Sequence, residues 1–152
     1  MFITFYIFHE VFTMDKKEFA ISLHDRGCNC AQSVLCSFAT ECGMNENTLM
    51  KMSEAFGLGC GGMNGICGAL SGALAAAGFR YADGNIEAPK TKKTTYKIAS
   101  RMCAEFEAKC GSLICKELKG IENGKPLLPC VECIKTGIEL AENMFGGKYD
   151  ND

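Results

Sequence analysis

Several kinds of residue are scarce in this chain, and each shortage excludes a class of function. Tryptophan does not occur among the 152 residues, there are two histidines, and sixteen basic residues stand against eighteen acidic ones. Since no strongly basic surface is implied, nucleic acid is not an expected partner. His9 lies in an atypical N-terminal segment and His24 is expected to face solvent near a helix end, so histidine-based catalysis is not predicted.

Long hydrophobic runs are also missing. Residues 1–12 are apolar but contain His9 and Glu10, and the apolar segment 66–79 has only fourteen residues, which is typical of a buried core helix. The first segment also lacks the positive start and the cleavage site of a signal peptide. We therefore expect no membrane insertion, and we expect residues 1–13 to be a non-native or disordered extension before a natural start at Met14.

The alternation of period two that marks strands does not exceed four residues after position 13. Apolar residues recur instead at helical spacing, which predicts an all-α, compact single-domain bundle of about five or six helices over residues 14–147. A flexible tail is expected over residues 148–152. The predicted helices cover residues 14–25, 28–42, 45–56, 66–79, about 91–110 and about 129–145, with a further short helix within 112–119.

Glycine is concentrated in and before the helix predicted for residues 66–79. Residues 57–65 contain five glycines in nine positions, which predicts a turn or loop. Gly68, Gly72 and Gly78 lie within the helix itself, where each costs about 1 kcal/mol relative to alanine. We therefore expect a packing or site reason for each of the three.

The most unusual feature of the composition is its cysteine content. The number of cysteines is odd, so at least one of them cannot be paired within the chain and must be a free thiol or bind another group. A secreted disulfide scaffold is usually shorter than this chain, whereas cytosolic chains this rich in cysteine more often bind metal or perform redox chemistry. We therefore expect a cytoplasmic location. The eleven cysteines are Cys28, Cys30, Cys36, Cys42, Cys60, Cys67, Cys103, Cys110, Cys115, Cys130 and Cys133.

Several of these cysteines fall at predicted helix starts, namely Cys28, Cys30, Cys67 and Cys130. The free N–H groups and partial positive charge of a helix N-terminus favour thiolate over thiol. The helix dipole contributes only about 0.3–1 kcal/mol, which corresponds to less than about one pKa unit. Full activation of a thiol would therefore also need a second thiol, a lysine or arginine, or a metal.

Two short cysteine motifs have different implications. Cys130 and Cys133 form a C-x-x-C on one helix, where residues three apart have Cα atoms about 5 Å from each other, which suits a disulfide or two metal ligands. Packing remains the alternative for Cys133. Cys28 and Cys30 are two apart and point to different faces, so only Cys30 is expected at a site. Core or loop filling is expected for Cys36, Cys42, Cys60 and Cys103.

Three segments carry a resemblance to a known family. They are GCNCAQSVL at residues 27–35, Phe56-Gly57 with the following glycine loop, and CGALSG at residues 67–72. Together they resemble the C_GCAxxG_C_C family of redox-active proteins over about residues 16–145. The resemblance implies four characteristic cysteines: Cys30, Cys67, Cys115, and either Cys130 or Cys133, of which Cys130 fits the family spacing better.

The resemblance implies thiol–disulfide exchange or electron transfer as the function, with Cys67 or Cys130 as the attacking thiolate and a neighbouring cysteine resolving the mixed disulfide. A redox partner protein, or a small thiol or disulfide, would be the partner, and family members suggest a link to a transporter. Two alternatives remain open, a non-enzymatic binding module with inert thiols and a zinc or iron–sulfur site. Candidate redox residues are Cys30, Cys67, Cys115, Cys130 and Cys133, and candidate metal ligands are Cys30, Cys67, Cys115 and Cys130.

Overall fold

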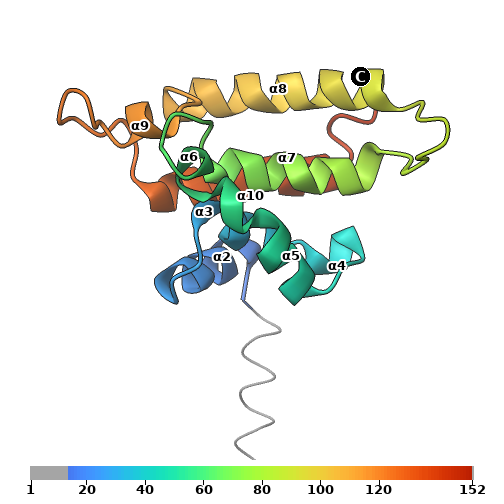
Figure 1. The fold of residues 1–152 in the computed structure, drawn as a ribbon, viewed down its shortest axis with the longest axis horizontal. Coiled ribbons are helices and arrows are strands. Elements are labelled where there is room, and N and C mark those ends of the chain that lie inside the picture. The colour runs from blue at the N-terminus through green and yellow to red at the C-terminus, as the bar shows by residue number, and fades with distance from the viewer. Residues whose placement is uncertain (1–13, 152) are drawn as a thin grey trace, which may run out of the picture.

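The computed structural model describes residues 14–151, which form helices joined by turns and loops, with an isolated antiparallel bridge between Ile66 and Ile114 (Figure 1). The predictions made for residues 1–13 fall outside the described residues. Six helices have seven or more residues, which confirms the all-α prediction, and shorter helices lie between them. The elements are α2 Lys16–Asp25, α3 Cys30–Cys36, α4 Ala39–Cys42, α5 Glu46–Ser53, η1 Glu54–Phe56, α6 Gly57–Cys60, α7 Gly68–Tyr81, α8 Lys92–Cys110, α9 Cys115–Leu118 and α10 Cys130–Phe145.

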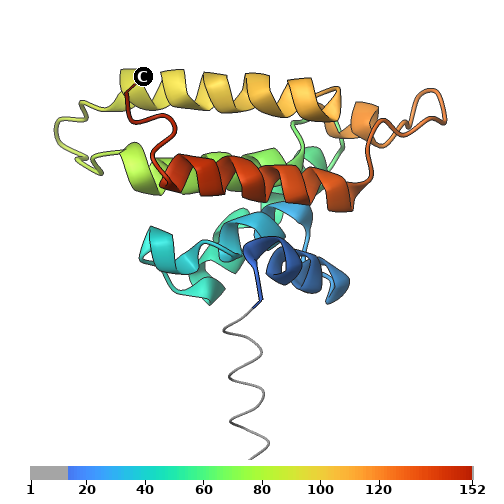
Figure 2. The same ribbon diagram turned by 180° about the vertical axis from the view of Figure 1, so that it is seen from behind.

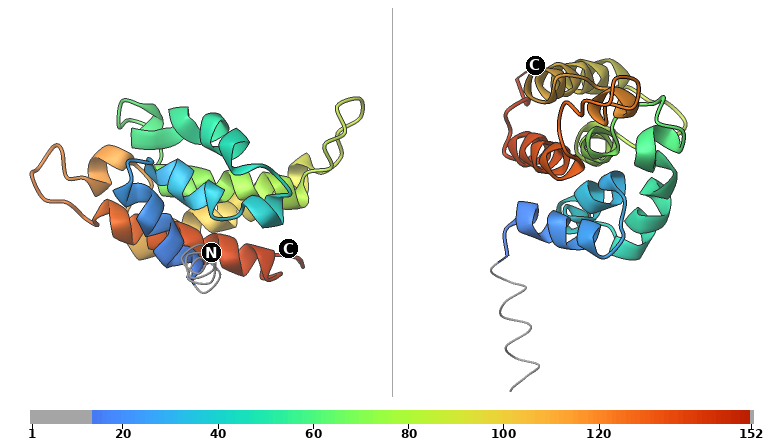
Figure 3. Two further views of the ribbon diagram at one scale, coloured as in Figure 1. Left: turned by 90° about the horizontal axis from the view of Figure 1, so that it is seen from below. Right: turned by 90° about the vertical axis from the view of Figure 1, so that its left-hand side faces the viewer.

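Helix α7 lies at the centre of the bundle. The long helix α8 runs along one side of α7 and α10, and Figure 2 shows helices α2 to α5 on the opposite side. Viewed end-on, α7 and α10 lie next to each other between these two layers (Figure 3). Over residues 14–151, no helix combines the length and the apolar character needed to cross a membrane.

The predicted helix over residues 28–42 is two helices in the structure. Asn29 forms a capping box with Gln32, in which each side chain accepts the other's backbone N–H, so α3 begins at Cys30 rather than at Cys28. The chain then bends at Phe38, whose buried ring stacks on Phe145 with 5.3 Å between ring centroids. Gly43 ends α4 in the left-handed conformation, which glycine adopts readily.

Two glycines allow the central helices to approach very closely. A Cβ at Gly72 would lie 2.7 Å from the carbonyl oxygen of Ala31 in α3, and a Cβ at Gly137 would lie 2.7 Å from that of Ala69 in α7. Gly68 has the same role at the start of α7. The prediction is wrong for Gly78, because a Cβ there would meet nothing within 4 Å.

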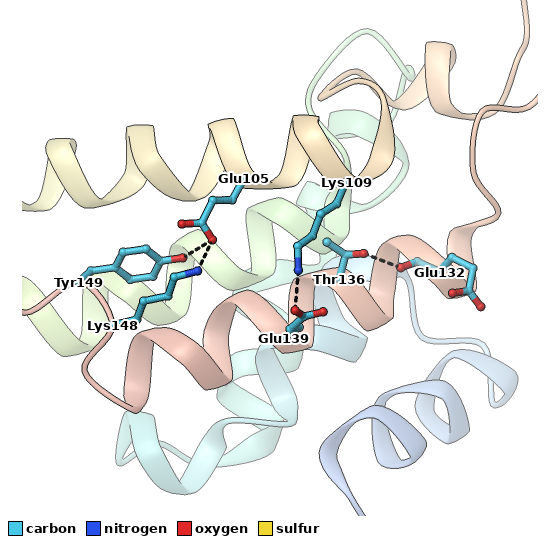
Figure 4. A network of polar contacts seen from close by, with 7 residues as sticks. All are labelled: Glu105, Lys109, Glu132, Thr136, Glu139, Lys148 and Tyr149. Carbon is cyan, nitrogen blue, oxygen red and sulfur yellow. Dashed lines mark hydrogen bonds and ion pairs between the residues drawn. The ribbon is translucent and has the colours of Figure 1, made fainter.

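The residues after α10 fold back onto α7 and α8, although the sequence predicts a flexible tail over 148–152. Tyr149 is 1% exposed. Its hydroxyl donates to Glu105 Oε2 at 3.1 Å, and Lys148 Nζ lies 2.8 Å from the same oxygen (Figure 4). Asp150 pairs with Arg80 at 2.9 Å. The described part of this segment is therefore packed.

We expect Tyr149→Phe to lower the free energy of unfolding by about 1.5 kcal/mol, because the buried ring stays while a hydrogen bond to a carboxylate is lost. Thermal unfolding followed by circular dichroism measures this change. Tyr96→Phe is the control, since Tyr96 is 65% exposed. Equal melting temperatures for the two variants would contradict the role assigned to the Tyr149 hydroxyl.

Candidate functional site

Cysteines from distant parts of the chain line one pocket of about 140 Å³ at the α9 end of the bundle. Cys30, Cys115 and Cys130 are the first residues of α3, α9 and α10, and Cys67 is the N-cap of α7. Cys133, one turn into α10, also lines the pocket. The structure thus brings together all five of the cysteines selected from the sequence.

Backbone hydrogen bonds between residues 65–67 and residues 113–115 fix two of these cysteines. The Cys67 N–H donates to the carbonyl of Leu113 at 2.7 Å, and the Cys115 N–H donates to the carbonyl of Gly65 at 3.0 Å. A Cβ at Gly59 would lie 2.6 Å from Cys115 Cβ, so this turn must be glycine to pass so close to the site. The loop predicted over residues 57–65 therefore serves to hold Cys67 beside Cys115.

Cys30 and Cys130 line the same pocket, and each shifts the pKa of the other. The Cys30 thiol donates to the Cys130 sulfur, and the ammonium group of Lys119 lies beside it, so the pKa of Cys130 falls to about 5 although burial acts in the opposite direction. The same hydrogen bond, together with burial, raises the pKa of Cys30. Cys130 is therefore the thiolate of the pair and Cys30 is the thiol.

Cys133 is the centre of a second group of sulfurs, in contact with both Cys67 and Cys110. Interaction with these neighbours raises the pKa of Cys133 and lowers those of Cys67 and Cys110, the latter to about 7. The Cys133 thiol is also directed at the carbonyl oxygen of Leu128, with 4.0 Å between sulfur and oxygen. A thiol has one hydrogen, so Cys133 can donate to only one of these three acceptors at a time.

Two contacts favour Cys67 as the ionised partner of Cys133. Besides the Cys133 thiol, the backbone N–H groups of Ala69 and Leu70 at the start of α7 lower the pKa of Cys67. Next to Cys110, the Thr136 hydroxyl donates instead to the carbonyl oxygen of Glu132 at 3.0 Å (Figure 4), so its hydrogen is not available to a Cys110 thiolate.

The other cysteines lie away from the pocket. Cys28 directs its thiol to Met50 Sδ at 3.9 Å, in agreement with the expectation that only Cys30 of this pair reaches a site. Burial raises the pKa values of Cys36 and Cys42 to about 11 and also raises that of Cys103. Cys60 is exposed on the glycine-rich segment. None of these five cysteines is among the residues that line the pocket.

Three residues of the site were not selected from the sequence. Lys119 ends α9 and reaches Cys130 only because the loop after it returns to the start of α10. Cys110 meets Cys133 because the end of α8 packs against α10. His24 was expected to face solvent, but it is half-buried, lines the pocket, and has Nδ1 3.0 Å from the Cys28 carbonyl oxygen.

All eleven cysteines are free thiols in this structure. Within residues 14–151, no set of three or more histidine, cysteine, aspartate or glutamate side chains is arranged to hold a metal ion. The four-thiolate site over Cys30, Cys67, Cys115 and Cys130 therefore remains a prediction from the sequence.

Comparison with known proteins gives one match. A family model described as "Putative redox-active protein (C_GCAxxG_C_C)" matches residues 28–144. No curated protein and no solved structure matches the chain. The matched range contains every cysteine of the pocket.

Proposed function

The chain belongs to the C_GCAxxG_C_C family of redox-active proteins, and from this membership and the sulfur geometry we propose that it performs thiol–disulfide exchange through Cys130 and Cys30. The observation that carries the proposal is that Cys30 and Cys130, the first residues of α3 and α10, line one pocket together with Lys119. A thiolate in contact with a second thiol is the arrangement that dithiol exchange requires. Its place is a reducing cytoplasm, where the dithiol form is maintained.

Solvent exposure distinguishes this pair from the other sulfurs of the pocket. Cys30 and Cys130 are half-buried, whereas Cys67, Cys115 and Cys133 are 6%, 7% and 2% exposed. A disulfide arriving from solvent therefore meets Cys130 or Cys30 first. The remaining three cysteines form the inner wall of the pocket.

The position of Cys130 explains its reactivity. Cys130 begins a helix of sixteen residues whose N-cap is Pro129, which has no side-chain acceptor for the first-turn N–H groups. Cys30 begins a helix of seven residues in which Asn29 already accepts the Gln32 N–H. The positive end of α10 and the Lys119 ammonium thus favour negative charge on Cys130.

The exchange proceeds in two steps. The Cys130 thiolate attacks a substrate disulfide, so a bond forms between Cys130 and one substrate sulfur while the other substrate sulfur leaves as a thiolate. Cys30 then gives up its proton, which passes to that leaving thiolate, and attacks the Cys130 sulfur. The second substrate sulfur leaves as a thiolate. The substrate disulfide gains two electrons, and Cys30 and Cys130 become a disulfide.

Re-reduction of the Cys30–Cys130 disulfide depends on the same difference in pKa between the two cysteines. An incoming thiolate that attacks Cys30 in the disulfide releases Cys130, and a thiol of low pKa is a good leaving group. Because Cys130 leaves as a stabilised thiolate, re-reduction at Cys30 is faster than at Cys130. The pair can therefore cycle between its two states with a small thiol or a partner protein.

Counting thiols before and after treatment with oxidised glutathione tests the proposal. The wild-type protein should lose thiols reversibly with a Cys30–Cys130 link, and Cys130→Ser should form no link to Cys30. Cys42→Ser is the control, because Cys42 is half-buried outside the pocket. Slow labelling of every pocket cysteine, with no link to Cys130, would refute the proposal and favour a binding module with inert thiols.

Replacement of Lys119 should shift the pH at which Cys130 reacts. Lys119→Gln removes the ammonium group beside the sulfur, so the midpoint of thiolate formation should rise by about one pH unit, and Lys119→Arg should restore it. The rate of modification of Cys130 as a function of pH gives this midpoint. Lys116→Gln is the matched control on the same short helix, because Lys116 pairs with Glu122 at the surface. An unchanged midpoint in Lys119→Gln would contradict the role of Lys119.

A further inference from the structure

The sulfurs of the pocket continue into the core of the protein. Behind the pair Cys30–Cys130, Cys67 and Cys133 line the same pocket, and Cys110 lies beside Cys133 where the end of α8 packs against α10. Cys110 is the last residue of α8, is 4% exposed, and does not line the pocket. A row of sulfurs therefore leads from the half-buried pair to a thiol that solvent hardly reaches.

We propose that Cys110 and Cys133 form a second, internal dithiol, which receives the disulfide from Cys30 and Cys130 by way of Cys67. The protein would then hold four exchangeable electrons per chain instead of two. This inference rests on the function proposed above, since the disulfide first forms at Cys130.

Backbone packing brings the two groups of sulfurs together. A Cβ at Gly68 would lie 3.3 Å from Cys30 Cβ and 3.1 Å from the Ala31 nitrogen, so the start of α7, with Cys67 at its N-cap, is pressed against the start of α3. Cys130 and Cys133 lie one turn apart on α10. Each step of the disulfide transfer therefore takes place between cysteines at or near the ends of neighbouring helices.

Three exchanges move the disulfide inwards. The Cys67 thiolate attacks Cys30, the bond between Cys30 and Cys130 breaks, and Cys130 leaves as a thiolate. Cys133 attacks Cys67, and Cys30 leaves. Cys110 then attacks Cys133, and Cys67 leaves. The protons lost by Cys133 and Cys110 end on Cys30 and Cys67, and no electron enters or leaves the protein.

Because Cys110 is buried, the second dithiol is protected from external oxidants. External disulfides and oxidants cannot contact a sulfur that is enclosed between α8 and α10, so oxidation reaches Cys110 through Cys133 alone. After each transfer, Cys30 and Cys130 are again a thiol and a thiolate at the pocket. They can then accept a second disulfide from outside.

Oxidation of the full chain with excess diamide tests this inference. The wild-type protein should lose four thiols and form the links Cys30–Cys130 and Cys110–Cys133. Cys110→Ser should lose two and retain only the first link, while the control Cys103→Ser, on the same helix but outside the row, should lose four. Cleavage after Glu132 separates Cys130 from Cys133, and fragmentation of the linked peptides assigns each bond.

A time course adds a second measurement that does not need the Cys110 variant to fold. With one equivalent of diamide, the Cys30–Cys130 link should appear first and the Cys110–Cys133 link should replace it, whereas Cys67→Ala should block the replacement. A wild-type protein that stops at Cys30–Cys130, with Cys110 still alkylated once the protein is denatured, would overturn the inference and leave the proposed function intact. A second link at other cysteines would also overturn it, and failure of any link at Cys130 would overturn both.

Discussion

At pH 5.5, Cys130 should react with an aromatic disulfide reagent about 20-fold faster than a thiol in a reference peptide. With a pKa of about 5, most of Cys130 is ionised at this pH. A peptide thiol with a pKa of about 8.5 is only about 0.1% ionised. The thiolate fraction therefore favours Cys130 by about 750-fold, and the weaker nucleophilicity of a low-pKa sulfur reduces this advantage by about 40-fold.

The same arithmetic predicts a reversal at higher pH. Near pH 7.5 the ionised fractions differ by only about 10-fold, which no longer compensates for the lower nucleophilicity, so the reference peptide should react faster there. The rate for Cys130 should fall below about pH 5, where its thiolate is protonated. Stopped-flow measurement of the released aromatic thiol gives both profiles.

Two variants make this prediction specific to Cys130. Cys130→Ser should lose the fast phase at pH 5.5 completely, because no other half-buried thiol of the pocket is ionised at that pH. Cys60→Ser removes an exposed thiol and should leave the fast phase unchanged. A fast phase that survives in Cys130→Ser would show that another sulfur is the nucleophile.

The second large effect is expected from Gly72→Ala at the contact between α7 and α3. The new Cβ would lie 2.7 Å from the Ala31 carbonyl oxygen and 3.1 Å from Val34 Cβ. A carbonyl within a helix cannot swing aside as a side chain can, so the two helices must separate. We expect a loss of about 1–3 kcal/mol in the free energy of unfolding. Cys30 precedes Ala31, so exchange activity should fall as well.

Gly78→Ala is a matched control on the same helix. A Cβ at Gly78 would meet no atom within 4 Å, so the higher helix propensity of alanine should raise the free energy of unfolding by up to about 1 kcal/mol. Chemical denaturation of both variants measures the two changes. Shifts of the same sign and size would show that the close approach at Gly72 does not limit stability.

Local patterns predicted much of this fold. Helical periodicity identified the long helices, and the ends at Gly43 and Gly111 follow from the left-handed conformation that glycine adopts most easily. The break at Phe38 could not be seen in the same way, because the pattern continues through it. Its cause is a contact with Phe145, more than one hundred residues further along the chain.

The site shows the same division between local and distant causes. Cysteines at helix starts are visible in the sequence, and the requirement for a second thiol or a cation beside each of them follows from the small size of the helix dipole. Which thiol and which cation meet the requirement depends on how the loop between Lys119 and Cys130 folds back. The path of this loop depends on tertiary contacts, which leave no periodic pattern in the sequence.

The separation of Cys30 and Cys130 along the chain has a consequence for the unfolded protein. A bond between them encloses everything from α3 to the start of α10 in a covalent ring of about 100 residues, which restricts the denatured ensemble by about 4.7 kcal/mol in the chain-entropy description. Molecules that carry the Cys30–Cys130 bond should therefore resist proteolytic degradation longer than reduced ones. The lifetime of this small protein would then depend on whether Cys30 and Cys130 are reduced or joined in a disulfide.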